Sequence, residues 1–196
     1  RDDARDYQSR KQQYFLPARA RPSGVRFRTQ PLQNRKEKEN DMTNDLKEVI
    51  VSHLGNTVSA VGFAPVERFA QAPEQHHPAK ICKNAQTVIV LGLQIPRGIL
   101  TSPDYNLYGL HRSYHTAYRR LDEIALELCN FIEAQGKYAA VMIPSYAPMV
   151  FHNFEPWGIL SLKHAAVRAG LGAFGRSGQV YHPVYGSRLR LAAVVT

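Results

Sequence analysis

Four glycines crowd into one short segment near the end of the chain, and they constrain its fold more than any other feature. They are Gly170, Gly172, Gly175 and Gly178. The apolar residues before them recur at helical spacing over residues 157–169, which predicts a helix that Gly170 ends. The apolar run at residues 189–196 predicts a strand. Because so many glycines let another group approach the backbone closely, we expect a binding loop between this helix and this strand.

Residues 170–175 also match the G-x-G-x-x-G dinucleotide-binding fingerprint letter for letter. That fingerprint requires a strand before the glycines and a helix N-terminus after them, which receives the pyrophosphate. Here a helix precedes the glycines, and a polar turn containing Arg176 and Ser177 follows them. The context therefore argues against a dinucleotide site.

The run from Lys163 to Thr196 resembles the corrinoid-binding core shared by epoxyqueuosine reductases and reductive dehalogenases. The similar features are a helix that ends in Ala-Gly-Leu-Gly at residues 169–172, the further Gly175, and a Tyr-Gly-Ser step at residues 185–187 before the last strand. Shorter matches extend upstream to about Val61: they are residues 61–63, 87–93, 114–115 and 147–148. The resemblance implies a nitroreductase-like fold that holds cobalamin, and a ferredoxin-like domain beyond it that delivers electrons.

The resemblance places the cofactor on the glycine-rich loop. The implied contacts are Gly170, Leu171, Gly172, Gly175, Arg176, Ser177 and Gly178. A nitroreductase-like scaffold can instead hold FMN, in which case Arg176, Arg188 or Arg190 would meet the phosphate. A third alternative is a non-catalytic remnant or interaction module that keeps only the fold.

In a cobalamin reductase the cofactor carries the electron chemistry, so the protein supplies shape, access and a proton donor. Residues 144–148 correspond to the segment where epoxyqueuosine reductases carry an aspartate as the proposed acid. Ser145 stands in that region here, and the neighbouring Tyr146 is the stronger acid of the two. Tyr146 is therefore the candidate donor, as a tyrosine is thought to be in reductive dehalogenases, and the alternative is a tyrosine that packs its ring and hydrogen-bonds its hydroxyl.

His115 is the third catalytic candidate. Tyr114 and His115 match the Asp-Tyr-His of the epoxyqueuosine branch, but Ser113 replaces the aspartate. His115 is interpreted as an acid, a substrate contact or a polar residue at the start of a helix. Because both carboxylates of that branch are missing, the match counts against epoxyqueuosine itself as the small-molecule substrate.

The chain contains only two cysteines, Cys82 and Cys129. Two cysteines that are far apart in the sequence exclude a disulfide framework, a CxxC zinc site and a four-cysteine iron–sulfur cluster within this sequence. We therefore expect electrons to come from a separate ferredoxin-like donor. His76 and His77 could form half of a metal site, but neither CxxC nor H-x3-H spacing accompanies them, which favours a solvated pair and no metal.

Residues 1–41 hold eleven Lys and Arg against six Asp and Glu, so they carry +5 of the formal net charge of +9. Scattered prolines and few aliphatic residues predict a disordered arm before a domain at residues 42–196, which we expect to stop short of the ferredoxin-like domain. The arm is either a nucleic-acid contact, tRNA being one candidate, or an extension upstream of a start at Met42. With no apolar run of membrane-spanning length, we expect a cytoplasmic protein without membrane contacts; a homodimer is left open.

The remaining pattern predicts an α+β domain in which a mixed, nitroreductase-like sheet is covered by helices. Helices are predicted at residues 43–54, 64–69 and 114–132, and strands at residues 58–63, 87–93 and 138–143. The strand at 87–93 is apolar throughout, so both of its faces should be buried. An aromatic cluster before the last helix is expected in the core, with a wall of the site as the alternative; it comprises Phe151, His152, Phe154 and Trp157.

Overall fold

The structure is a computed structural model that describes residues 46–101, 107–136, 139–146, 150–152 and 155–196. These residues belong to one compact unit, Thr43–Thr196. The arm expected at residues 1–41 and the aromatic residue Phe154 lie outside the described residues.

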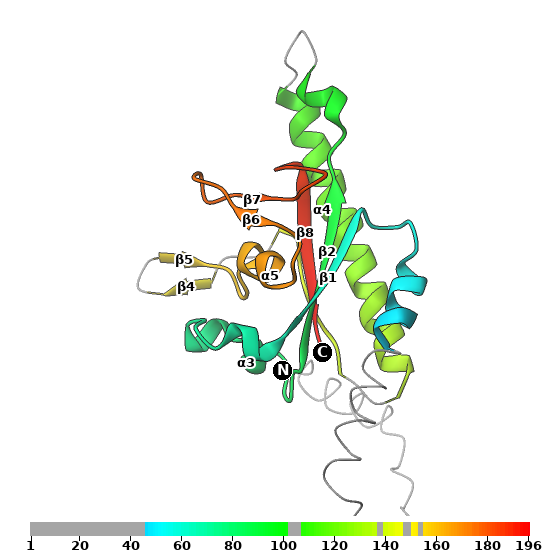
Figure 1. Ribbon diagram of the computed structural model, residues 1–196, viewed down its shortest axis with the longest axis vertical. Helices are drawn as coiled ribbons and strands as arrows, with labels where there is room; N and C mark the ends of the chain where they lie inside the picture. Colours follow the sequence, from blue (N-terminus) through cyan, green and yellow to red (C-terminus); the bar gives the residue numbers. More distant parts are fainter. Residues whose placement is uncertain (1–45, 102–106, 137–138, 147–149, 153–154) are drawn as a thin grey trace, which may run out of the picture. The chain divides into compact units, whose positions relative to one another are not determined.

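A four-stranded sheet forms the centre of the described domain, with strand order β1-β2-β8-β3 (Figure 1). The strands are β1 (Ala60–Pro65), β2 (Thr87–Gln94), β3 (Val141–Ile143) and β8 (Leu189–Val195). In the central pairing Val90 lies opposite Ala193, and β3 extends the sheet by placing Ile143 opposite the same alanine. All pairings between these described strands are antiparallel, so the expectation of a mixed sheet was wrong for them.

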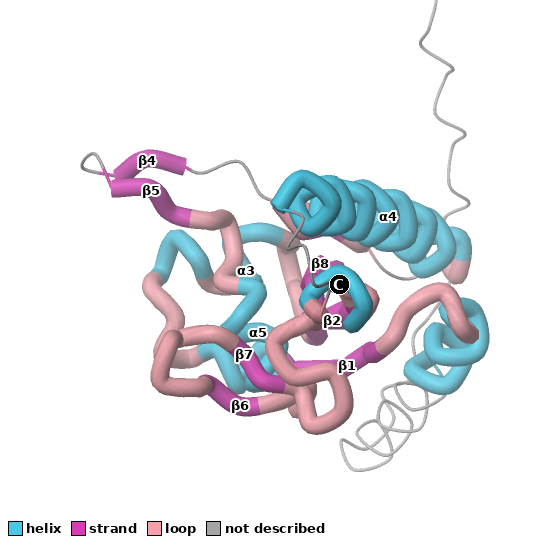
Figure 2. Tube along the Cα trace, turned by 90° about the horizontal axis from the view of Figure 1, so that it is seen from above, coloured by secondary structure: helices cyan, strands magenta, loops and turns pink. Residues whose placement is uncertain are grey.

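Helices cover both faces of the sheet, as predicted. The long helix α4 (Leu107–Ala134) and the helix at residues 46–54 pack on one face, where Ile89 and Leu91 of β2 join their core. The short helix α5 (Leu162–Arg168) packs on the other face against Val88 and Val90. Figure 1 and the view from above in Figure 2 both place α4 and α5 on opposite sides of β2 and β8. Because helices cover both faces of β2, this strand is apolar throughout whether its neighbouring strands are parallel or antiparallel to it. Its composition therefore did not reveal that the sheet is antiparallel.

Short elements occupy the connections. They are the 3-10 turns η2 (Val66–Phe69), η3 (Glu74–His76) and η4 (Arg97–Leu100), helix α3 (Pro78–Ile81), and the paired short strands β4 (Val150–His152) with β5 (Glu155–Trp157) and β6 (Ala173–Phe174) with β7 (Val180–Tyr181). The helix expected from residue 157 begins only at Leu162, because Trp157 belongs to β5. Pro156 and Gly158 flank that tryptophan, and both residue types disfavour a helix.

Cys129 lies on α4 in the core of the sheet face that α4 covers, and it is 7% exposed. Burial raises the pKa of its thiol from 9.0 to about 11, with smaller contributions from Glu133 and Cys82. Because the pKa in the folded state lies above that in the unfolded state, the stability that the neutral thiol contributes is fully present below pH 9 and is lost as the pH rises toward 11.

Between pH 8 and about pH 10.5 we therefore expect the free energy of unfolding of the parent to fall by about 1–2 kcal/mol more than that of Cys129→Ala. Urea denaturation of both proteins at each pH measures this difference, and the comparison cancels the titration of other groups. Identical pH slopes for the two proteins would show that Cys129 ionises as easily in the folded state as in the unfolded chain.

Candidate functional site

The glycine-rich segment begins as the C-terminal cap of α5. Gly170 has φ +77° and donates its N–H to Val167 O at 3.0 Å, and Leu171 donates its N–H to Ala166 O at 2.9 Å. These two bonds form a Schellman motif, which confirms that Gly170 ends the helix. The Leu171 side chain is 6% exposed and packs into the core beneath α5. Its backbone, and not its side chain, is therefore what a ligand would meet at this position.

Beyond the cap, the segment is a β-hairpin of β6 and β7. Its turn is closed by the N–H of Gly178, which donates to Gly175 O at 3.0 Å. A Cβ atom at Gly172 would collide with the carbonyl group of Tyr181, and one at Gly175 would lie 2.5 Å from the Tyr181 ring. At Gly170 and Gly178 a Cβ atom would meet nothing within 4 Å. Tyr181 thus restricts positions 172 and 175, and Gly178 closes the hairpin turn, whereas positions 170 and 178 border open space.

The three arginines expected at a phosphate have different environments. Arg176 is exposed in the hairpin turn beside Ser177. Arg188 donates through Nη1 to Ile95 O at 2.7 Å, so its guanidinium serves the fold. The guanidinium of Arg190 lies 3.8 Å from the centre of the Tyr114 ring, and its Nε is buried without a hydrogen-bond partner among the described residues.

Two of the catalytic candidates come together where β3 ends beside α4. The His115 and Tyr146 rings are 6.1 Å apart between centroids, and Tyr118 lies 5.6 Å from Tyr146. Tyr146 is 71% exposed, so it is not a buried packing residue. Because α4 begins at Leu107, His115 lies in the interior of the helix, and its interpretation as a residue at a helix start was wrong.

A carboxylate that the sequence did not reveal holds this segment in place. Asp122 of α4 accepts a hydrogen bond through Oδ1 from the backbone N–H of Ser145 at 2.7 Å. The Ser145 Oγ is buried and has no hydrogen-bond partner among the described residues. Sequence matching found no acid here because Asp122 is 23 residues from Ser145. The one feature of the sequence that could have pointed to Asp122 is its position one helical turn after Tyr118.

A separate hollow of about 630 Å³ lies on the α5 face of the sheet. Its lining includes Phe69, His76, Ser161, His164 and Arg168. The Ser161 Oγ lies 2.7 Å from His164 Nδ1, at the first turn of α5. Arg168 is held by its own bond from Nε to a backbone carbonyl at 2.6 Å. This hollow could not be predicted from local sequence patterns, because its walls come from residues 69–76 and 158–168, which are far apart in the chain.

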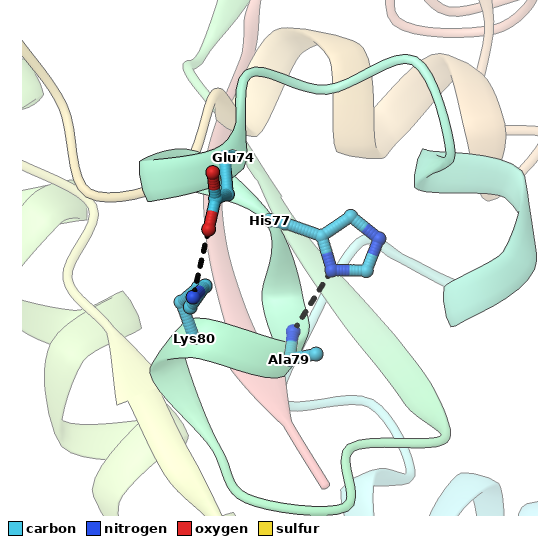
Figure 3. A network of polar contacts seen from close by, with 4 residues as sticks. All are labelled: Glu74, His77, Ala79 and Lys80. Atoms are coloured by element: carbon cyan, nitrogen blue, oxygen red, sulfur yellow. Dashed lines mark hydrogen bonds and ion pairs between the residues drawn. The ribbon is translucent and has the colours of Figure 1, made fainter.

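The histidine pair near α3 serves the local fold. His77 Nδ1 accepts a hydrogen bond from the N–H of Ala79 at 3.2 Å and thereby caps α3, beside an ion pair of Lys80 with Glu74 at 2.9 Å (Figure 3). The hydrogen bond from Lys80 lowers the pKa of Glu74. His76 is 8% exposed, so the prediction of a solvated pair was wrong for this residue. Within the described ranges, no group of three or more His, Cys, Asp or Glu side chains could hold a metal ion.

The aromatic residues before α5 do not form the expected core as far as they are described. Phe151 is 66% exposed on β4. His152 and Trp157 belong to β4 and β5, and their side chains lie outside the described part of the structure. None of the described helices is long and apolar enough to span a membrane.

Solved structures of epoxyqueuosine reductases are similar to this chain, whereas no protein-family model and no curated protein sequence matches it. A selenomethionine-labelled epoxyqueuosine reductase has a TM-score of 0.52 at 16% identity, and the match covers 78% of this chain and 45% of that chain. An epoxyqueuosine reductase from Bacillus subtilis gives a TM-score of 0.50 at 16% identity with the same coverage. This chain thus spans less than half the length of those enzymes, and its described domain has the fold of the part that matches.

Proposed function

We propose that this chain is the corrinoid-binding domain of a reductase of the epoxyqueuosine reductase and reductive dehalogenase type. The observation that carries the proposal is the fold similarity to epoxyqueuosine reductases, at a TM-score of 0.52. The residues from Lys163 to Thr196 resemble the same enzymes, and they include the α5 cap, the hairpin and β8 of the shared fold.

The surface of the β6–β7 hairpin is compatible with a large, flat cofactor edged with amide groups. Gly170 and Gly178 border open space on the hairpin, which permits close approach to their backbone. Phe174 and Tyr181 of the hairpin are 41% and 49% exposed, so apolar surface is available to a ring. Separately, the Ser145 Oγ at the end of β3 is buried and has no hydrogen-bond partner among the described residues. Cobalamin, when bound, supplies the electron-transfer chemistry of the cobalt ion.

The protein itself contributes a proton donor and a backbone segment that holds this donor in place. Tyr146 is the proposed proton donor, because it is exposed and lies next to His115. Asp122 holds the backbone of Ser145 and thereby fixes the segment that carries the tyrosine. The two cysteines of these residues cannot ligate a four-cysteine cluster, so the proposed electron donor is a ferredoxin-like module outside these residues.

Titration of the purified chain with cobalamin tests the proposal. We expect a change in the visible spectrum of the cofactor that saturates at one equivalent. Ser177→Trp adds a bulky side chain in the exposed hairpin turn and should weaken binding at least about tenfold by obstructing approach to the loop. Ser52→Trp, at an exposed position of the helix at residues 46–54, is the matched control and should bind as the parent does.

Binding of FMN and not cobalamin would instead support the flavin alternative, and binding of neither would leave the chain as a non-catalytic module. Two of the three arginines that the flavin alternative invokes are engaged within the protein, since Arg188 bonds Ile95 O and Arg190 stacks on Tyr114. That engagement favours cobalamin.

A further inference from the structure

His111 and His115 form a pair on α4, and the proposed function uses only His115 and assigns no role to His111. They are four residues apart on one face of the helix, and their Nε2 atoms lie 3.0 Å from each other. The H-x3-H spacing that is absent around His76 and His77 thus occurs here. Two imidazoles at this spacing on a helix are a recurrent metal-binding arrangement. We propose that His111 and His115 chelate one divalent transition-metal ion, with copper preferred.

The two nitrogen atoms are at hydrogen-bond distance in this structure, and the same separation is compatible with chelation of one ion. If each Nε2 binds an ion at about 2.05 Å, nitrogens 3.0 Å apart subtend an angle of about 95° at the metal. This angle is close to that of neighbouring ligands in tetragonal geometry and well below that of a tetrahedral zinc site. Copper(II) and nickel(II) favour tetragonal geometry with nitrogen ligands, and copper(II) binds such ligands most tightly among the first-row divalent ions.

The proposed two-histidine metal site is open to solvent on the side of His111. His111 is exposed and His115 is half-buried, with its ring close to those of Tyr118 and Tyr146. Because no third His, Cys, Asp or Glu joins the pair within the described ranges, water or an added small ligand would complete the coordination. Arg112 and Arg119 are exposed on the same helix, and their charge weakens binding of a cation to a moderate affinity.

The test is a titration of the full chain with Cu²⁺ at neutral pH. The parent should bind one equivalent, with the visible absorption and electron paramagnetic resonance of tetragonal copper that has two nitrogen ligands. His111→Ala and His115→Ala should each weaken binding about 100-fold, because removal of either ring turns a chelate into a single ligand. His53→Ala is the matched control: this exposed helical histidine stacks on Phe131 and is not part of the pair.

Circular dichroism of each variant establishes that the fold is retained. Copper binding that survives in both His111→Ala and His115→Ala overturns the proposal, and so does an equal loss of binding in His53→Ala. Absence of a one-equivalent copper complex in the parent also overturns it. The readout needs no cobalamin and no turnover, so its failure is separate from failure of the proposed reductase function.

Discussion

Gly172→Val should lower the free energy of unfolding by about 3–5 kcal/mol and displace the β6–β7 hairpin. The added Cβ would collide with the carbonyl group of Tyr181, which is backbone and cannot rotate away. Ala173 pairs with Tyr181 in the hairpin, so relief of the collision requires that this pairing be broken. The backbone of Gly172, with φ +156°, also disfavours a β-branched residue. Urea denaturation measures the loss, and near-ultraviolet circular dichroism reports the environment of Tyr181.

Gly178→Val provides the matched control. Gly178 also has a positive φ, +67°, but a Cβ there meets nothing within 4 Å. Its substitution should therefore cost only the backbone strain, about 1–2 kcal/mol. Equal losses in the two variants would show that the contact with Tyr181 is not what requires glycine at position 172. A loss of cobalamin binding in Gly172→Val is expected as well, but it would follow from the displaced hairpin and would not identify a ligand contact.

Patterns within a few consecutive residues predicted the central strands and one helix end. The apolar runs at β2 and β8 predicted the two central strands. Gly170, with φ +77°, ends α5 as predicted. These predictions succeeded because burial of a short apolar run and left-handed backbone are properties of a few consecutive residues.

Contacts between distant residues explain what the sequence did not reveal. The need for glycine at 172 and 175 depends on Tyr181, which reaches them only after the hairpin closes. The role of Asp122 depends on Ser145, which lies on another element. In both cases the residue type was visible in the sequence and its partner was not. Beyond the helix end at Gly170, the glycine-rich segment was therefore interpreted as a ligand site, although its other three glycines belong to the hairpin.

Tyr146→Phe should reduce turnover by the isolated chain at least about 100-fold and leave its affinity for cobalamin unchanged. The substitution removes only the hydroxyl from a side chain that is 71% exposed, so the fold should be unaffected. Reductive cleavage of a carbon–oxygen or carbon–halogen bond takes up two electrons and at least one proton. In this proposal the electrons come from an added strong chemical reductant, and the proton comes from the Tyr146 hydroxyl.

Product formation is measured on an epoxyqueuosine-containing RNA stem-loop and on a halogenated phenol, one probe for each branch that the sequence resembles. Turnover with a mild donor alone would contradict the proposal that the electrons come from an iron–sulfur module outside these residues. Tyr118→Phe is the matched control, because Tyr118 lies 5.6 Å from Tyr146 on α4 and should lose little activity. If Tyr146→Phe retains full turnover under the strong reductant while cobalamin stays bound, the proton reaches the substrate from another group, and His115, whose ring lies 6.1 Å from Tyr146, is the next to substitute.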